Sequence, residues 1–127
     1  MLLVRVARGR FDPARYDEVR KMLDGSRDRL IPAIEELPGI ISCYVGAEPN
    51  GTIVNHSVWN SAEQARAMDT LGPLVAFRQD LAGRGIQFEP ILVYEVVWRV
   101  ERPTPPRRRT SVMATDRLPA LDELPEP

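Results

Sequence analysis

The sequence predicts an α+β fold, a ferredoxin-like βαββαβ domain with a four-stranded antiparallel sheet. Four runs rich in apolar residues, at 2–7, 40–46, 52–59 and 91–100, have the length and composition of strands. Two stretches between them, 12–37 and 61–82, instead repeat apolar residues at spacings of three and four, as amphipathic helices do. The resulting order of elements defines the split βαβ arrangement, with both helices on one face of the sheet.

The chain of 127 residues has room for one domain with a modest core. We assign residues 1–100 to this domain, because the composition changes after Val100. Residues 101–127 hold six of the twelve prolines and five charges of each sign. Such a composition cannot bury enough apolar surface to fold alone, so this segment is predicted to be a Pro-rich charged tail.

Local signals place the start of the first helix and predict a break inside it. Asp12 is a good N-cap, and Pro13 follows at the first helical position, where its missing N–H costs nothing. Gly25 and Pro32 weaken the helix interior. We therefore expect either one long helix with a bend or two consecutive helices.

Turn and cap signals bracket the third strand. Asn50-Gly51 between two strand-like runs predicts a hairpin. Ser61, with Gln64 three residues later, forms a capping box that predicts the start of the next helix. Alternation along the strand between these signals predicts that one face carries Ile53, Asn55, Ser57 and Trp59.

The face of the sheet away from the helices is predicted to be apolar, because three of the four strands are mostly apolar on both faces. Soluble monomers rarely expose such a patch, so we expect a homodimer that stacks sheet against sheet. His56 points to this face and is interpreted as an interface residue. Arg5 and Glu95 fall on neighbouring strands and are expected to pair there.

Composition excludes several classes of function. The net charge of −1 offers no long-range field for nucleic acid or an anionic membrane, and no segment is apolar enough to span a bilayer. The N-terminal apolar run is too short for a signal peptide, so a cytoplasmic location is expected. With one histidine and one cysteine, Cys43, the usual metal sites lack their ligands. Cys43 lies in an apolar run and is interpreted as a small buried residue.

The predicted topology, with Asn55-x-x-x-Trp59 closing the third strand and Ser61-x-Glu63-Gln64-Ala65 opening the next helix, resembles the antibiotic biosynthesis monooxygenase (ABM) domain. This group belongs to the dimeric α/β-barrel superfamily. The resemblance covers residues 1–100 and implies a homodimer with a pocket for a small molecule between sheet and helices in each subunit.

The resemblance also implies a reaction. The cofactor-free monooxygenases of the family oxygenate activated aromatic substrates directly with O₂, and in them an asparagine and a tryptophan four residues apart hydrogen-bond the substrate oxygens. Carried over, Asn55 would hold a carbonyl or developing enolate, and the Trp59 indole would be a second donor. Arg78 corresponds, within one residue, to an arginine of the second helix. The tyrosine expected near the start of that helix is replaced by Ala65.

Other interpretations stay open. A tryptophan at a strand end beside a helix is more often a core residue than a catalytic one, so the core is the other interpretation of Trp59. Four further aromatic residues would either line a pocket or fill a core: Tyr16, Phe77, Tyr94 and Trp98. The main alternative function is a non-catalytic, small-molecule-binding or stress-related dimer with the same pocket. A haem-binding relative is a third hypothesis, although the helix that should supply an axial histidine offers Met68 and Asp69.

Overall fold

The computed structural model describes residues 1–103, in which the strands form one antiparallel sheet. These strands are β1 (Leu3–Arg10), β2 (Ile40–Glu48), β3 (Thr52–Trp59), β4 (Gln87–Phe88) and β5 (Leu92–Glu95). The spatial order is β2-β3-β1, and β4 and β5 both pair with the remaining edge of β1. The predicted ferredoxin-like α+β fold is confirmed. Most of the predicted tail, from residue 104 onward, lies outside the described residues.

The fourth predicted strand is divided and shorter than expected. β4 pairs with Gly9 and Arg10 near the end of β1, whereas β5 pairs with residues 3–6 near its start. Pro90, which cannot donate a backbone hydrogen bond, lies between the two strands. The last ladder contact is made by the Val96 amide, which donates to the Leu2 carbonyl. β1 begins at Leu3, and within residues 1–103 the backbone after Val96 pairs with no strand.

The helical stretch after β1 consists of two consecutive helices, one of the two predicted outcomes. It comprises a 3₁₀ turn, η1 (Pro13–Arg15), then α1 (Tyr16–Gly25) and α2 (Arg27–Glu35). Asp12 caps it, since its Oδ1 accepts from the Ala14 amide at 2.9 Å. At the break, the buried Ser26 hydroxyl donates to the Leu23 carbonyl at 2.6 Å, which satisfies a group at the end of α1.

The second helical stretch has three parts, α3 (Ala62–Ala65), the 3₁₀ segment η2 (Arg66–Thr70) and α4 (Gly72–Gly83). The predicted cap at its start is present, because the Ser61 Oγ accepts from the Gln64 amide at 3.2 Å. η2 places Met68 in the core and Asp69 at a half-exposed position. This short segment therefore touches both the interior and the surface.

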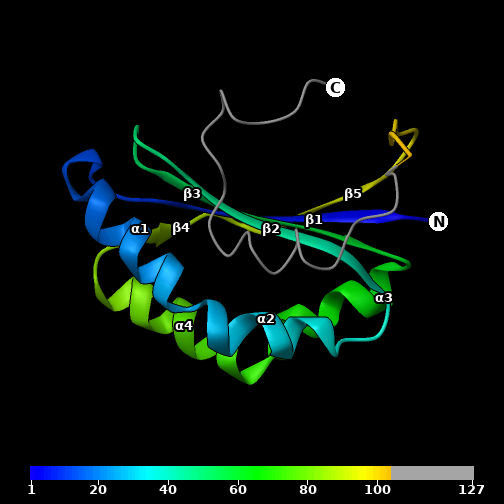
Figure 1. Cartoon of the computed structure of the whole chain (residues 1–127), viewed down its shortest axis with the longest axis horizontal. Coiled ribbons are helices and arrows are strands. Elements are labelled where there is room, and N and C mark those ends of the chain that lie inside the picture. The colour runs from blue at the N-terminus through cyan, green and yellow to red at the C-terminus, as the bar shows by residue number, and fades with distance from the viewer. Residues whose placement is uncertain (104–127) are drawn as a thin grey trace, which may run out of the picture.

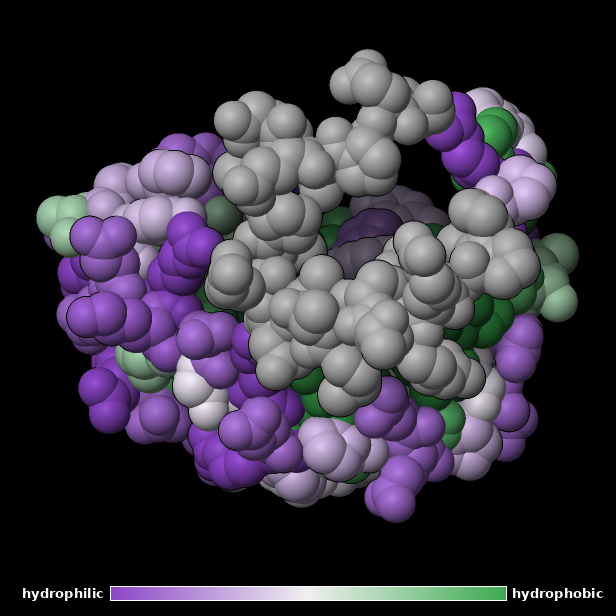
Figure 2. Space-filling view, viewed as in Figure 1, coloured by the Kyte–Doolittle hydropathy of each residue, from purple (hydrophilic) through white to green (hydrophobic). Residues whose placement is uncertain are grey.

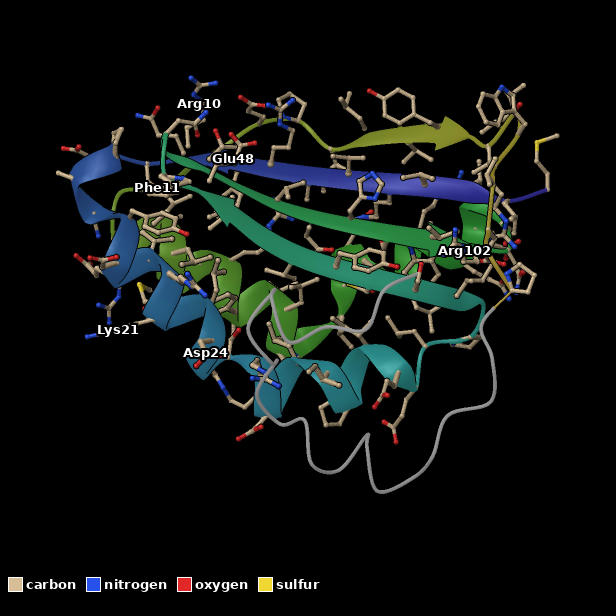
Figure 3. The ribbon with its side chains drawn as sticks, turned by 45° about the horizontal axis from the view of Figure 1, so that its top comes forward. Arg10, Phe11, Lys21, Asp24, Glu48 and Arg102 are labelled. Atoms are coloured by element: carbon tan, nitrogen blue, oxygen red, sulfur yellow. The ribbon has the colours of Figure 1, made fainter. Side chains whose placement is uncertain are left out.

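The helices cover one face of the sheet, and the core lies between the two layers (Figure 1). Their outward side is largely hydrophilic (Figure 2), as expected for amphipathic helices. At the end of β1, Phe11 points into the space between the layers, whereas Arg10 points away from it (Figure 3). Within residues 1–103 no helix is both long and apolar enough to cross a membrane.

The β2–β3 hairpin depends on Gly51, whose φ of 103° lies in the left-handed region. The Gly51 carbonyl accepts from the Phe11 amide at 2.9 Å, so the turn is fixed to the end of β1. A Cβ on residue 51 would lie 2.3 Å from the Phe11 carbonyl oxygen. The predicted hairpin is therefore confirmed, and glycine is required there on two grounds.

In residues 1–103 the opposite face of the sheet has no helix over it (Figure 1). It carries apolar side chains from β1, β2, β3 and β5, with Arg8, Arg10 and Glu48 at one end. Its residues follow from the strand register, in which Tyr44 pairs with His56 and Val4 with Tyr94. The large exposed apolar side chains on this face are Tyr44, Leu92 and Tyr94. His56 is exposed on the same face, as predicted.

Arg5 does not pair with Glu95 on this face. The register places Arg5 opposite Val93 and Glu95 opposite Leu3. Arg5 instead points to the helix side, where it is 2% exposed and contacts Asp69. The expectation assigned the wrong face and the wrong partner, because alternation along β1 fixes which residues share a face but not which face is covered.

Candidate functional site

A cavity of about 1020 Å³ lies between the sheet and the helices. Its floor is the helix-facing side of β1, β2 and β3, and its walls are α1, α2 and α4. Ile31 of α2 and Val45 of β2 line it and are about half exposed, so the cavity reaches the surface between these two elements. Most of its lining is apolar, and this size suits a drug-sized ligand.

Asn55 lies on the floor of this cavity. Alternation along β3 turns its side chain to the helix face, and its register partners are Ala7 of β1 and Val45 of β2. The Cys43 thiol donates to Asn55 Oδ1 at 3.4 Å. With Oδ1 engaged in this way, the Nδ2 group of the amide is the donor suited to a ligand oxygen.

Cys43 is a partly buried thiol beside Asn55. Burial raises the pKa of the Cys43 thiol, and the positive charge of Arg5 acts in the opposite direction. The thiol is therefore protonated at neutral pH and serves as a hydrogen-bond donor rather than as a nucleophile.

Trp59 is separated from the cavity. Its side chain is 0% exposed, and its indole N–H donates to the Oγ of Ser57, also fully buried, at 2.8 Å. Within the described residues, Trp59 belongs to the core and is outside the cavity lining. This placement differs from the expectation of an indole donor facing the substrate, because Ser57, two residues earlier on the same face, already accepts that hydrogen bond.

Three of the predicted substrate-binding residues line the cavity: Tyr16, Phe77 and Arg78. Tyr16 begins α1, and the other two are neighbours on α4. The guanidinium carbon of Arg78 lies 4.8 Å from the centroid of the Phe88 ring, a cation–π contact that fixes the side chain over β4. Their role in binding remains a prediction.

Tyr94 and Trp98 lie elsewhere. Tyr94 pairs with Val4 and so points to the outer face of the sheet, where it is about half exposed. Trp98 follows the end of β5 and is 78% exposed. The structure therefore does not bring these two residues to the cavity. The reason is that β5 ends at Glu95, and alternation turns Tyr94 away from the helices.

Sequence reasoning missed Arg5 as a site residue. Arg5 lines the cavity, is almost fully buried, and its Nη2 lies 2.7 Å from Asp69 Oδ1. The available signal was a charged residue between Leu3 and Ala7 on one face of an apolar strand, since buried charges are rare unless they are paired. What could not be foreseen is the partner, which lies 64 residues away.

The positions offered for a haem ligand are both engaged. Met68 is 1% exposed within the core, and Asp69 pairs with Arg5. Over residues 1–103, no group of three or more His, Cys, Asp and Glu side chains is placed to hold a metal ion.

Comparison with known proteins identifies the fold. No family model matches the sequence. No curated protein matches it at a significant level either. Solved structures do match, and they define the class: the chain has the fold of the antibiotic biosynthesis monooxygenase proteins, which confirms the structural resemblance predicted from the sequence.

Three of these structures illustrate the likeness. SnoaB from Streptomyces nogalater, a cofactor-independent oxygenase, aligns with a TM-score of 0.57 and 14% identity over 80% of this chain and 98% of its own. A protein from Deinococcus radiodurans, provisionally named an antibiotic biosynthesis monooxygenase, aligns with a TM-score of 0.60 and 11% identity over 80% and 99%. A third protein, with the same provisional name and from Chloroflexus aurantiacus, aligns with a TM-score of 0.52 and 18% identity over 80% of this chain and 98% of its own. At these identities the likeness is one of fold.

Proposed function

We propose that the protein binds a planar aromatic small molecule in its cavity and oxygenates it with O₂ without a cofactor. The observation that carries this proposal is the position of Asn55, a polar amide on the floor of a largely apolar cavity. A donor aimed at developing negative charge in such surroundings stabilises an enolate well. SnoaB, which shares the fold, is a cofactor-independent oxygenase.

In this reaction the substrate supplies the electrons. An anthrone-type substrate loses a proton from its CH₂ group, and the Asn55 Nδ2 group donates to the enolate oxygen. The carbanion then reduces O₂ and forms a C–O bond, and the peroxide takes up the proton. Loss of the second CH₂ proton breaks the O–O bond, so that one oxygen atom becomes the new carbonyl of the product and the other leaves as water. The substrate is acidic enough to need little help from a protein base.

The test is oxidation of anthrone by the full chain under air, with quinone formation followed by absorbance and the rate without protein subtracted. Asn55→Ala should lower the rate by about 100-fold, the usual effect of removing one such donor. Asn60→Ala is the matched control, because Asn60 is exposed beyond the end of β3. Equal rates for the wild type and Asn55→Ala, or no turnover across a panel of anthrones and naphthols, would count against the proposal.

The alternative is binding without chemistry, and one observation favours it. The Trp59 indole donates to Ser57, so only one of the two predicted donors is available to a substrate. In that case anthrone binds to the protein, Asn55→Ala weakens this binding, and no product forms under O₂. Turnover above the background rate would exclude this alternative.

We further propose that two copies of the chain associate through the outer faces of their sheets. The support is the exposed apolar surface formed by Tyr44, Leu92 and Tyr94. Large patches of this kind usually mark an interface. The helix-side cavity would remain accessible in such a dimer, because it lies on the opposite side of the sheet.

A further inference from the structure

Two arginines and one carboxylate meet beside the cavity. Arg5 of β1 and Arg78 of α4 both line it. Asp69 of η2 binds Arg5 at 2.7 Å and is itself half exposed. Burial and the charge of Arg5 lower the pKa of Arg78, and Asp69 partly opposes this shift, so the charge of Asp69 acts on both guanidinium groups. One negative charge therefore faces two positive ones, and this end of the cavity carries an excess positive charge.

Each arginine also has a donor without a partner. Nη1 of Arg5 and Nε of Arg78 are buried, and no residue of the described part of the chain accepts a hydrogen bond from them. Buried polar groups in native proteins are almost always hydrogen-bonded, because leaving one unpaired costs about 1–3 kcal/mol. Two such donors at one site indicate that an acceptor belongs there.

The electrostatics agree with this. Partial burial lowers the pKa of Arg78, the nearby charge of Arg5 lowers it further, and Asp69 offsets only part of the effect. A second anionic group would stabilise the positive charge of both guanidinium groups. A neutral ligand would leave them as they are.

We propose that the ligand of this cavity is an aromatic carboxylic acid whose carboxylate is bound by Arg5 and Arg78. Guanidinium groups hold carboxylates through charge-assisted hydrogen bonds, which are stronger than neutral ones. Asn55 contacts a separate oxygen of the ligand, and the apolar walls hold its rings. This inference rests on the proposed function, since it names the class of substrate for the same cavity.

The experiment compares two probes of the same shape and different charge, anthracene-9-carboxylate and anthracene-9-carboxamide. Their binding to the full chain is measured by fluorescence anisotropy at neutral pH. The wild type should bind the carboxylate about 10-fold more tightly than the carboxamide. Higher salt should reduce this preference.

Variants assign the preference to named residues. Arg78→Met should bring the two affinities within about 2-fold by weakening the carboxylate alone. Asp69→Asn should strengthen carboxylate binding by about 2- to 5-fold. The substitution removes the negative charge that competes with the ligand for Arg5, and the asparagine amide still accepts a hydrogen bond from Arg5. A residue with only a structural role would not produce such a gain. Arg8→Met, on the exposed outer side of β1, removes the same charge and should leave the ratio unchanged.

Three results would overturn the inference: equal affinity for the two probes, a ratio unaffected by both Arg78→Met and Asp69→Asn, or binding of neither probe. The oxidation of anthrone separates this failure from that of the proposed function. If anthrone is oxidised with dependence on Asn55 while the probes bind equally, the substrate class alone is wrong.

Discussion

Nη2 of Arg5 lies 2.7 Å from Oδ1 of Asp69, so a buried guanidinium in the sheet is held by a carboxylate that is 50% exposed on η2. This pair connects segments that are 64 residues apart in the chain. It also has two effects at once, since it stabilises the packing of η2 on the sheet and sets the charge at one end of the cavity.

The first prediction concerns the stability that this pair provides. Asp69→Ala leaves a buried guanidinium without its carboxylate and should lower the free energy of unfolding by about 1–3 kcal/mol, measured by urea denaturation. Glu89→Ala is the matched control, because within the described part of the chain Glu89 pairs only with the exposed Arg8 and Arg10, at 3.7 and 3.6 Å. That change should cost less than about 1 kcal/mol. Equal losses in the free energy of unfolding would show that the burial of Arg5 does not increase the stability that its ion pair provides.

The second prediction concerns the Trp59–Ser57 hydrogen bond. Ser57→Ala leaves the buried indole N–H without an acceptor and should destabilise the fold by about 1–3 kcal/mol. In the double variant Ser57→Ala with Trp59→Phe, the unpaired donor is absent as well, so the two single losses should sum to more than the double loss. Additive losses in the thermal unfolding of the four proteins would contradict the coupling.

The third prediction compares two glycines. Gly51→Ala forces a left-handed backbone conformation on alanine and places its Cβ against the Phe11 carbonyl, so it should cost about 1–3 kcal/mol. Gly25→Ala, at the end of α1, meets nothing within 4 Å and should stabilise the protein by about 0.5–1 kcal/mol. Differential scanning calorimetry of both variants checks the opposite signs.

The fourth prediction follows from the raised pKa of the Cys43 thiol. The contribution of this group to stability is complete below the pKa of a thiol in the unfolded chain and is lost as the pH rises through the higher folded value. The stability difference between wild type and Cys43→Ala should therefore fall as the pH rises above about 8.5, the usual pKa of a free thiol. Over the same range, alkylation by iodoacetamide should lag behind that of a free thiol. A constant stability difference would contradict the shift.

The fifth prediction tests the proposed dimer. The wild type should sediment as two subunits at micromolar concentration. Leu92→Glu places a charge on the outer face of the sheet and should shift the equilibrium to the monomer. Ile31→Glu puts the same charge on the helix side, at a position of similar exposure, and should leave the dimer intact. A monomeric wild type would remove the case for association.

What the sequence could predict was local. The caps at Asp12 and Ser61 and the turn at Gly51 each depend on residues within a few positions, and all three are present. Alternation along β3 also predicted that Asn55 shares a face with Ile53, Ser57 and Trp59, which the register bears out. These features need no knowledge of what packs against them.

What the sequence could not predict depends on distant segments. Trp98 has a strand-like pattern but pairs with no strand within residues 1–103, because β1 begins at Leu3. The charge of Arg5 was visible, yet its partner Asp69 becomes apparent only when η2 is placed on the sheet. The engagement of the Trp59 indole by Ser57 needs side-chain geometry, which periodicity does not contain.

η2 spans only Arg66–Thr70, and its one acidic side chain adjusts the charge of a cavity that it does not line. Substitutions at Asp69 would therefore change the charge beside the cavity without replacing any residue that lines it. Laboratory evolution of new selectivity could start from this one half-exposed position rather than from the interior, where each replacement disturbs packing.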